Sequence, residues 1–248
     1  MSISLSIQDS IATIIMDNPS KLNALSDSVM GELNEKLLNI EQRASVLVIT
    51  GCEKAFAAGV EVGEINARSY EGAHIDEFID YRWERVFDVK IPVIAAVSGY
   101  ALGGGFELAL MCDIIIASRS AVFGFPEVNL GIMPGMGGTQ LLTSIVGPKV
   151  ASEIIMTGEF FSAMKALDLH IISQIVAEED LMKATMLLAK NISQKSSMST
   201  RLIKEAIRVA QNQGLNSGIR TERIMFRSMF STDSKRNGIR DFLQKKKH

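Results

Sequence analysis

Short apolar runs rich in β-branched residues alternate with amphipathic helical segments over the first 135 residues, and this alternation most restricts the possible folds. Ser45–Thr50 and Pro92–Val97 contain no charged residue, as expected of strands buried on both faces of a sheet. Each run follows a segment with apolar residues at helical spacing, over 27–43 and 75–89. The pattern therefore predicts an α/β core around parallel strands.

Further strands are predicted on both sides of these runs, at Ile3–Ile7, Ala12–Met16, Ile114–Ala117 and Val122–Phe125. After Gly147 the sequence becomes mainly helical, and one strand-like run, Ile171–Val176, interrupts the helices. The predicted helices are Lys149–Met156, Glu178–Ile192, Ser199–Gln213, Asn216–Phe230 and Lys235–Lys247. We expect a boundary between about 170 and 195, with an α/β core over 1–190 and a helical region over 191–248.

Charge and cysteine content exclude several classes of protein. Lys and Arg number 26 against 28 Asp and Glu, so the net charge of −2 gives no overall attraction to nucleic acid or to an anionic membrane. Cys52 and Cys112 are too few for a disulfide framework, and reduced thiols suit a cytosolic protein. The uncharged stretch Ile91–Phe106 is shorter than the ~20 residues that span a membrane. The N-terminus resembles neither a secretory signal nor a mitochondrial transit segment, so we expect a cytoplasmic location.

Several common catalytic motifs are missing from the sequence. It contains no GxGxxG dinucleotide motif, no GxxxxGK[ST] phosphate loop and no GxSxG nucleophile elbow. The three histidines form no HExxH motif, so the sequence gives no support for a metal site.

Two glutamates stand alone in apolar, glycine-rich surroundings. Glu107 is the only charged residue between Lys90 and Asp113, and Glu127 follows it by twenty residues. Burial of a carboxylate raises its pKa, which suits a group that transfers protons near neutral pH. A structural interpretation stays open for each: Glu107 as an acid at the start of a helix, and Glu127 as a cap or ion-pair partner. Their spacing does not show whether the two carboxylates meet.

Two segments of small residues offer backbone N–H groups to a ligand. Gly103–Gly105 precede a predicted helix, where free N–H groups suit an anionic oxygen. The loop around Ala57–Val60 follows a predicted strand and also offers free backbone N–H groups. Alone, this loop is a weak signal. The basic tail Lys245–Lys247 needs no function, because lysines are favourable at a helix C-terminus.

Together these segments resemble the crotonase (enoyl-CoA hydratase/isomerase) superfamily, and specifically its enoyl-CoA hydratase branch. The similar motifs follow the family's order over nearly the whole chain. They include Phe56–Gly59, Gly99–Gly105, Phe123–Glu127, Pro134–Thr139 and Phe230–Asp233. The resemblance implies a crotonase-like spiral of ββα units, with a helical C-terminal region that forms trimers.

The resemblance also implies a reaction, the syn addition of water to a trans-2-enoyl-CoA to give a 3-hydroxyacyl-CoA. It assigns the backbone N–H groups of Val60 and Gly104 to an oxyanion hole for the thioester enolate. Glu127 is implied to protonate C2, and Glu107 to orient and activate the water. Isomerases of the superfamily usually keep one acidic residue, so the pair favours hydration. An isomerase or a multifunctional hydratase is the alternative.

Recognition of the acyl-CoA substrate is implied by the same motifs. Coenzyme A is part of the substrate, and no separate cofactor is implied. By resemblance, the backbone of Ala57, Ala58 and Gly59 contacts it, Lys21 contacts a phosphate, and the N–H of Gly135 lies near the reacting region. Lysine acts on phosphate as a point charge and needs no rigid geometry.

Other residues of the resemblance belong to subunit assembly or depart from the family's pattern. Phe230 and Lys245 resemble residues that a neighbouring subunit supplies, which implies a homo-oligomer, either a trimer or a dimer of trimers. Val60 stands where hydratases commonly have Ala, Glu61 replaces a usual Asp, and Gly63 stands where a long side chain is common. A branched Val60 side chain is expected to narrow the acyl pocket.

Two interpretations from other classes have less support in the sequence. A catalytically idle CoA-binding member would be favoured by loss of either glutamate, and both are present. An RNA-binding relative would need a lysine-rich helix face, and the sequence offers only the cluster at its end. We therefore expect no nucleic-acid or membrane partner.

Overall fold

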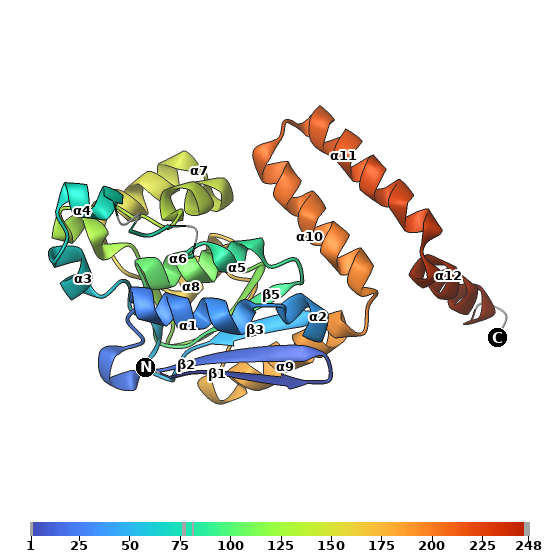
Figure 1. The fold of residues 1–248 in the computed structure, drawn as a ribbon, viewed down its shortest axis with the longest axis horizontal. Coiled ribbons are helices and arrows are strands. Elements are labelled where there is room, and N and C mark those ends of the chain that lie inside the picture. Colours follow the sequence, from blue (N-terminus) through green and yellow to red (C-terminus); the bar gives the residue numbers. More distant parts are fainter. Residues whose placement is uncertain (1, 76–77, 81, 246–248) are drawn as a thin grey trace.

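The computed structural model describes residues 2–75, 78–80 and 82–245, and these residues form two sheets (Figure 1). The larger sheet has the strand order β1-β2-β3-β5-β7-β10, and the smaller has the order β4-β6-β8-β9. Only the pairs β1·β2 and β8·β9 are antiparallel among the described strands. The strands are β1 (Ser2–Gln8), β2 (Ile11–Asp17), β3 (Val46–Thr50), β4 (Ala55–Ala57), β5 (Val93–Val97), β6 (Tyr100–Leu102), β7 (Ile114–Ser118), β8 (Val122–Gly124), β9 (Phe161–Ser162) and β10 (Gln174–Val176).

From β3 to β8, successive strands alternate between the two sheets, and this produces repeated ββα units. Strands β3, β5 and β7 lie in the larger sheet, and the strand after each of them lies in the smaller sheet. A helical element follows every such pair, and the parallel pairing stacks one unit on the next. The helices are α1 (Asp27–Leu37), α2 (Ile40–Arg43), α3 (Val62–Asn66), α4 (Tyr70–Ile75), α5 (Arg85–Asp88), α6 (Gly104–Leu110), α7 (Gly138–Thr157), α8 (Ala163–Asp168), α9 (Leu181–Ser193), α10 (Ser197–Asn212), α11 (Leu215–Ser228) and α12 (Asp233–Lys245), with short 3-10 helices η1 (Pro19–Lys21), η2 (Pro126–Leu130), η3 (Glu178–Asp180) and η4 (Met229–Ser231).

The uncharged runs form strands that are buried on both faces, as the sequence predicts. Every residue of β3 and β5 is buried. Side chains alternate along a strand, so Val46 and Val48 pack toward α9, while Leu47 and Ile49 join the core that contains Leu33 of α1. Figure 1 shows α1 and α9 on opposite sides of the larger sheet. No helix in the described part of the chain combines the length and the apolar character that a membrane span requires.

A buried asparagine joins the first hairpin to the second sheet. Asn23 has a φ of 55°, a left-handed conformation that asparagine tolerates better than most residues. Its Nδ2 donates to the carbonyl oxygen of Met16 at 3.0 Å, and to those of Ala55 and Phe56 at 2.8 and 3.2 Å. These bonds connect β2 to β4, the strand that leads to Val60.

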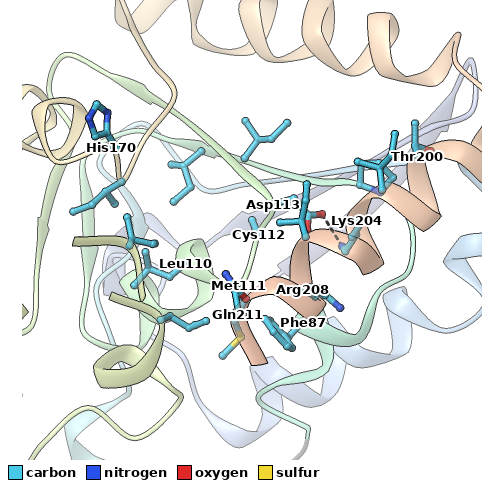
Figure 2. Close-up of a pocket in the computed structure, with 18 of the residues that line it drawn as sticks. Phe87, Leu110, Met111, Cys112, Asp113, His170, Thr200, Lys204, Arg208 and Gln211 are labelled. Carbon is cyan, nitrogen blue, oxygen red and sulfur yellow. Dashed lines mark ion pairs between the residues drawn. The ribbon is translucent and has the colours of Figure 1, made fainter. Parts of the chain in front are cut away.

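Helices α10 to α12 extend away from the two sheets, and an ion pair of the buried Lys204 attaches α10 to them (Figure 1). Figure 2 shows Lys204 reaching Asp113 from α10, with Nζ and Oδ2 2.6 Å apart, and Nζ also donates to the carbonyl oxygen of Ile91 at 2.9 Å. Burial lowers the pKa of Lys204, and the charge of Asp113 opposes this effect. A cavity of about 450 Å³ lies beside the pair, between Ile203 and the core. The division of the chain at residue 190 stays a prediction.

Two predicted helices are interrupted in the structure. The helix predicted over 27–43 is broken into α1 and α2, because Asn39 adopts a left-handed φ of 56°. The helix predicted over 75–89 is wrong: α4 ends at Ile75, α5 covers only Arg85–Asp88, and Ile79 between them has a φ of 60°. Three residues of that range, 76, 77 and 81, lie outside the described part of the chain.

Helix α7 is longer than predicted and bends in its middle. It begins at Gly138, eleven residues before the predicted start at Lys149. Gly147 interrupts it with a φ of 77° and a ψ of 163°, and Pro148 follows. Because Gly147 and Pro148 are signals that break a helix, the sequence predicts a helix only after them.

Candidate active site

Glu107 is buried in α6 and held by a loop of backbone donors. Its residue is only 1% exposed, so it is not a solvated acid at a helix start. Oε1 accepts hydrogen bonds from the N–H of Met136 at 2.8 Å and of Gly138 at 2.7 Å. Burial raises the pKa of Glu107, while the N–H groups of Gly138, Met136 and Gly135 oppose this rise. The carboxylate is therefore fixed in orientation by the loop 135–138.

Glu127 is the second residue of η2 and lies close enough to Glu107 for the two charges to interact, as the hypothesis of a pair requires. Burial, and to a smaller degree the charge of Glu107, raises the pKa of Glu127 to about 7. None of the described residues donates a hydrogen bond to its buried Oε2. Oε1 lies 2.7 Å from the position that a β-carbon on Gly103 would occupy, and Gly103 has a φ of 50°. Only glycine fits there without moving the carboxylate.

The backbone N–H groups of Val60 and Gly104 lie beside each other. Gly104 is the first residue of α6, where the helix provides no acceptor for its N–H. Leu25 donates to the carbonyl of Gly59 at 2.8 Å and accepts from Glu61 at 2.7 Å, so the intervening Val60 N–H points to the opposite side. The Val60 nitrogen is 3.6 Å from the position that a β-carbon on Gly104 would take. The two donors can therefore converge on one oxygen.

A close approach of α6 to β4 produces this arrangement. A β-carbon on Gly105 would lie 2.0 Å from the carbonyl oxygen of Ala57, so a larger residue would push the helix away from the strand. Without a side chain, Gly105 allows the start of α6 to lie against the end of β4. The glycine triplet is thus required for packing as well as for its N–H groups.

The predicted contacts with coenzyme A lie at the same end of β4. Ala58 donates its N–H to the carbonyl oxygen of Leu22 at 2.9 Å, and Gly59 has a φ of 106°. Lys21 lies beside this segment, with Nζ 2.8 Å from Oε1 of Glu61 in an exposed ion pair. The structure thus brings the predicted phosphate contact near the loop of small residues.

Two predicted residues are not brought to this site within one chain. Phe230 lies in η4, is 56% exposed and packs edge-on against Phe226. Figure 1 shows α11 and α12, which flank η4, far from α6. Lys245 is the last residue of α12, and its side chain lies outside the described residues.

Met136 is a site residue that sequence reasoning missed. It is buried, and its Sδ lies 3.2 Å from the β-carbon position of Gly104, while Cγ2 of Val60 lies at 3.0 Å. These two side chains flank the N–H group of Gly104, and Met136 also donates to Glu107. An apolar residue within a glycine-rich run gave no chemical signal. Within the described ranges, no group of three or more His, Cys, Asp or Glu residues is placed to hold a metal ion.

Comparisons with known proteins give matches over nearly the whole chain. The sequence profile of the enoyl-CoA hydratase/isomerase family matches residues 6–248. A probable mitochondrial enoyl-CoA hydratase from Dictyostelium discoideum is 39% identical over 95% of this chain and 86% of its own. A probable enoyl-CoA hydratase from Rhizobium meliloti is 38% identical over 97% of this chain and 94% of its own.

A solved structure matches the fold of this chain over nearly its whole length. A crystal structure from Geobacillus kaustophilus, described as enoyl-CoA "hydrates" subunit I, superposes with a TM-score of 0.95 and 41% identity. It covers 99% of this chain and 96% of its own. The expected fold is therefore confirmed.

Proposed function

This chain belongs to the enoyl-CoA hydratase/isomerase family, and we propose that it adds water reversibly to a trans-2-enoyl-CoA. The observation that carries the proposal is the pair of glutamates, buried Glu107 and half-buried Glu127, beside the N–H groups of Val60 and Gly104. The enzyme would act as a lyase on acyl-CoA in fatty-acid metabolism.

In this mechanism the thioester oxygen accepts hydrogen bonds from Val60 and Gly104. Addition at C3 moves negative charge onto that oxygen, and the two donors stabilise the resulting enolate. One such donor contributes roughly 3–4 kcal/mol in other enzymes. The branched Val60 side chain and Met136 then border the acyl group near the reacting carbons.

The two carboxyl groups have different tasks because their surroundings differ. Water forms its new bond to C3 and passes a proton to Glu107, whose Oε1 is already oriented by two N–H groups. Glu127 gives a proton to C2, and its pKa of about 7 keeps that proton available near neutral pH. A later proton exchange restores both groups, so one water is consumed for each product.

The proposal is tested by following the loss of enone absorbance of crotonyl-CoA. We expect rapid loss with the wild type, and drops of about a hundredfold or more for Glu107→Gln and Glu127→Gln. Glu159→Gln, at an exposed glutamate, is the matched control and should keep full activity. A wild type that is inert here but shifts the double bond of a 3-enoyl-CoA would establish the isomerase alternative instead.

We also propose that the chain works as a homo-oligomer, a trimer or a dimer of trimers. Large apolar side chains on α10 and α11 remain exposed in the single chain, among them Ile207, Leu215 and Phe226. Burial of such residues by a second copy is favourable. Sedimentation velocity measures the assembly, and a monomer at micromolar concentration would contradict the proposal. In an oligomer, Phe230 and Lys245 become available to a neighbour's acyl-CoA, while Lys21 serves its own.

A further inference from the structure

The segment between α4 and α5 touches the candidate active site through one strained residue. Ile79 has a φ of 60°, which is costly for a β-branched side chain. Its Cδ1 atom lies 3.4 Å from the position that a β-carbon on Gly135 would take. Gly135 begins the loop whose N–H groups hold Glu107. Strain of this kind persists only where the surroundings enforce it, so contacts around Ile79 must hold it in place.

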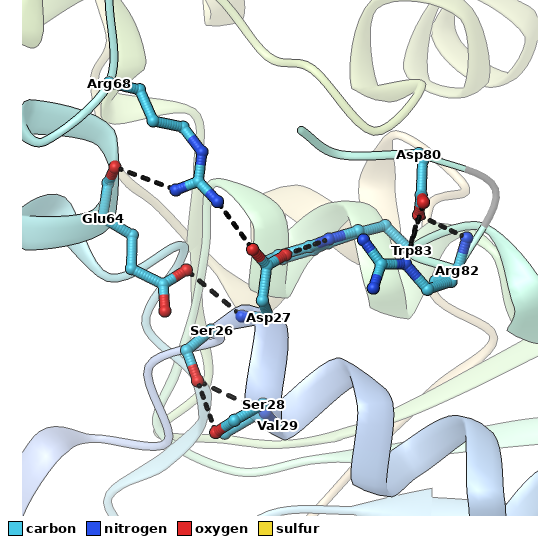
Figure 3. A network of polar contacts seen from close by, with 9 residues as sticks. All are labelled: Ser26, Asp27, Ser28, Val29, Glu64, Arg68, Asp80, Arg82 and Trp83. Atoms are coloured by element: carbon cyan, nitrogen blue, oxygen red, sulfur yellow. Dashed lines mark hydrogen bonds and ion pairs between the residues drawn. The ribbon is translucent and has the colours of Figure 1, made fainter. Parts of the chain in front are cut away.

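The carboxylate of Asp27 binds one residue on each side of Ile79 along the chain, Arg68 before α4 and Trp83 before α5. Figure 3 shows Asp27, the first residue of α1, between Arg68 and Trp83. Oδ2 of Asp27 accepts from Nη2 of Arg68 at 2.7 Å, and Oδ1 accepts from Nε1 of Trp83 at 3.1 Å. The backbone N–H of Asp27 donates in turn to Oε2 of Glu64 at 3.1 Å. Both carboxylate oxygens are thus used, which fixes the plane of the group.

The two partners of Asp27 meet again at Phe78, the neighbour of Ile79. The guanidinium of Arg68 lies 4.0 Å from the centroid of the Phe78 ring, in cation–π geometry. Trp83 meets the same ring edge-on, with centroids 6.1 Å apart. Asp27, Arg68, Phe78 and Trp83 together are called the Asp27 clamp. Through Phe78, the clamp sets the place of the strained residue.

We propose that the Asp27 clamp is a positioning device that holds Ile79 against Gly135, and so keeps the N–H groups of the loop 135–138 aligned on Glu107. The inference rests on the proposed function, because it takes Glu107 as the residue that orients water. Asp27 acts through Ile79 and Gly135, and it does not touch the substrate.

Stability alone is a weak explanation of the clamp. The side chains of Arg68 and Asp27 are 20% and 31% exposed, and ion pairs accessible to water contribute little to folding. A network in which two carboxylate oxygens and two aromatic rings hold the neighbour of one strained residue is better suited to fixing the backbone geometry of that residue. We therefore expect its loss to affect turnover more than folding.

The test compares Asp27→Asn and Trp83→Phe with a control at the same helix end. Trp83→Phe keeps an aromatic ring but removes the indole N–H and part of the ring volume at a fully buried position, so its thermal stability is compared with that of Asp27→Asn, which leaves the packing unchanged. Ser26→Ala is the control, because it removes the cap that accepts from Val29 N–H and leaves the clamp intact. For all variants, kcat and KM are measured with crotonyl-CoA, thermal stability is recorded, and hydrogen exchange is followed in peptides covering 135–138.

The expected result is a fall in kcat of about ten- to a hundredfold in both clamp variants, with KM within about twofold of the wild type. Exchange over 135–138 should rise in these variants and not in Ser26→Ala, even where Ser26→Ala lowers the melting temperature as much. Unchanged kcat and unchanged exchange in the clamp variants overturn the proposal, as does an equal effect in Ser26→Ala.

Failure of the proposed function is distinguishable from failure of the clamp. A wild type that is inert on crotonyl-CoA refutes the proposed reaction, and the exchange measurement then decides the clamp by itself, since it needs no substrate. An active wild type with normal clamp variants refutes the clamp alone.

Discussion

Replacing Glu127 by glutamine is expected to make the protein more stable at alkaline pH while it destroys activity. In the folded protein burial raises the pKa of Glu127 from 4.5 to about 7. The unfolded chain therefore loses this proton at lower pH than the folded chain does. Between these two pKa values the folded state binds more protons, so stability falls as pH rises. Above pH 7 the loss is complete and constant.

The size of the effect follows from the shift. A difference of about 2.5 pKa units corresponds to ~3.4 kcal/mol at most, using 1.36 kcal/mol per unit. Glu127 is only half-buried, and water screens part of this cost, so we expect roughly half of it, about 1.5–2 kcal/mol. Glutamine keeps the shape of the side chain and carries no charge, so it removes this cost.

Urea denaturation of the wild type and Glu127→Gln at about pH 5 and pH 8 measures the difference. The variant should gain little at the lower pH and the full amount at the higher one. Glu159→Gln, at an exposed glutamate, should show no such trend. A variant that is less stable than the wild type at pH 8, or an advantage that does not change with pH, would refute the reasoning. Together with the activity assay, this would separate folding from catalysis at one residue.

Three further predictions concern other parts of the structure. Lys204→Met should cost about 1–2 kcal/mol in urea denaturation, because it removes the ion pair with the partly exposed Asp113 and the hydrogen bond to the carbonyl oxygen of Ile91 at the base of α10. Gly138→Ala should abolish most crotonyl-CoA hydration, since the new methyl group would lie 2.9 Å from Oε1 of Glu107 and displace it. Phe226→Asp on α11 should shift the assembly to smaller species in sedimentation velocity, and an unchanged profile would exclude α11 from the interface.

The parts of the fold that local sequence determines were predictable. Runs such as Val46–Thr50 contain only apolar or β-branched residues, and burial on both faces follows directly from that composition. The break at Asn39 and the bend at Gly147 depend on single backbone conformations, so their neighbours' helical spacing conceals them. These errors are local, and they move no strand of the sheets.

The region over 75–89 was not predictable for a different reason. Its apolar residues recur at helical spacing, yet Phe78 and Trp83 are placed by Arg68 and by Asp27, which is more than fifty residues away from Trp83. Long-range contacts of this kind override local propensity.

The candidate site divides in a similar way. The two glutamates were recognisable as isolated carboxylates, and the resemblance supplied their roles, which stay predictions. Their proximity required the fold, because α6 and η2 belong to successive units. Met136 was missed, because it contributes a backbone N–H and a position beside Gly104. Neither depends on the type of residue, so neither can be recognised in the sequence.

The buried amide of Asn23 has a consequence for the order in which the chain folds. Its Nδ2 is satisfied only when Met16, Ala55 and Phe56 have all arrived, and an unpaired buried amide costs roughly 1–3 kcal/mol. While β4 is detached, the amide stays open to water and has only the carbonyl of Met16 as a partner from the hairpin. Once β4 docks, the amide is buried, and the carbonyls of Ala55 and Phe56 must then be in place to pair with it. The docking of β4, and with it the placement of the loop that carries Val60, is therefore coupled to the register of the first hairpin.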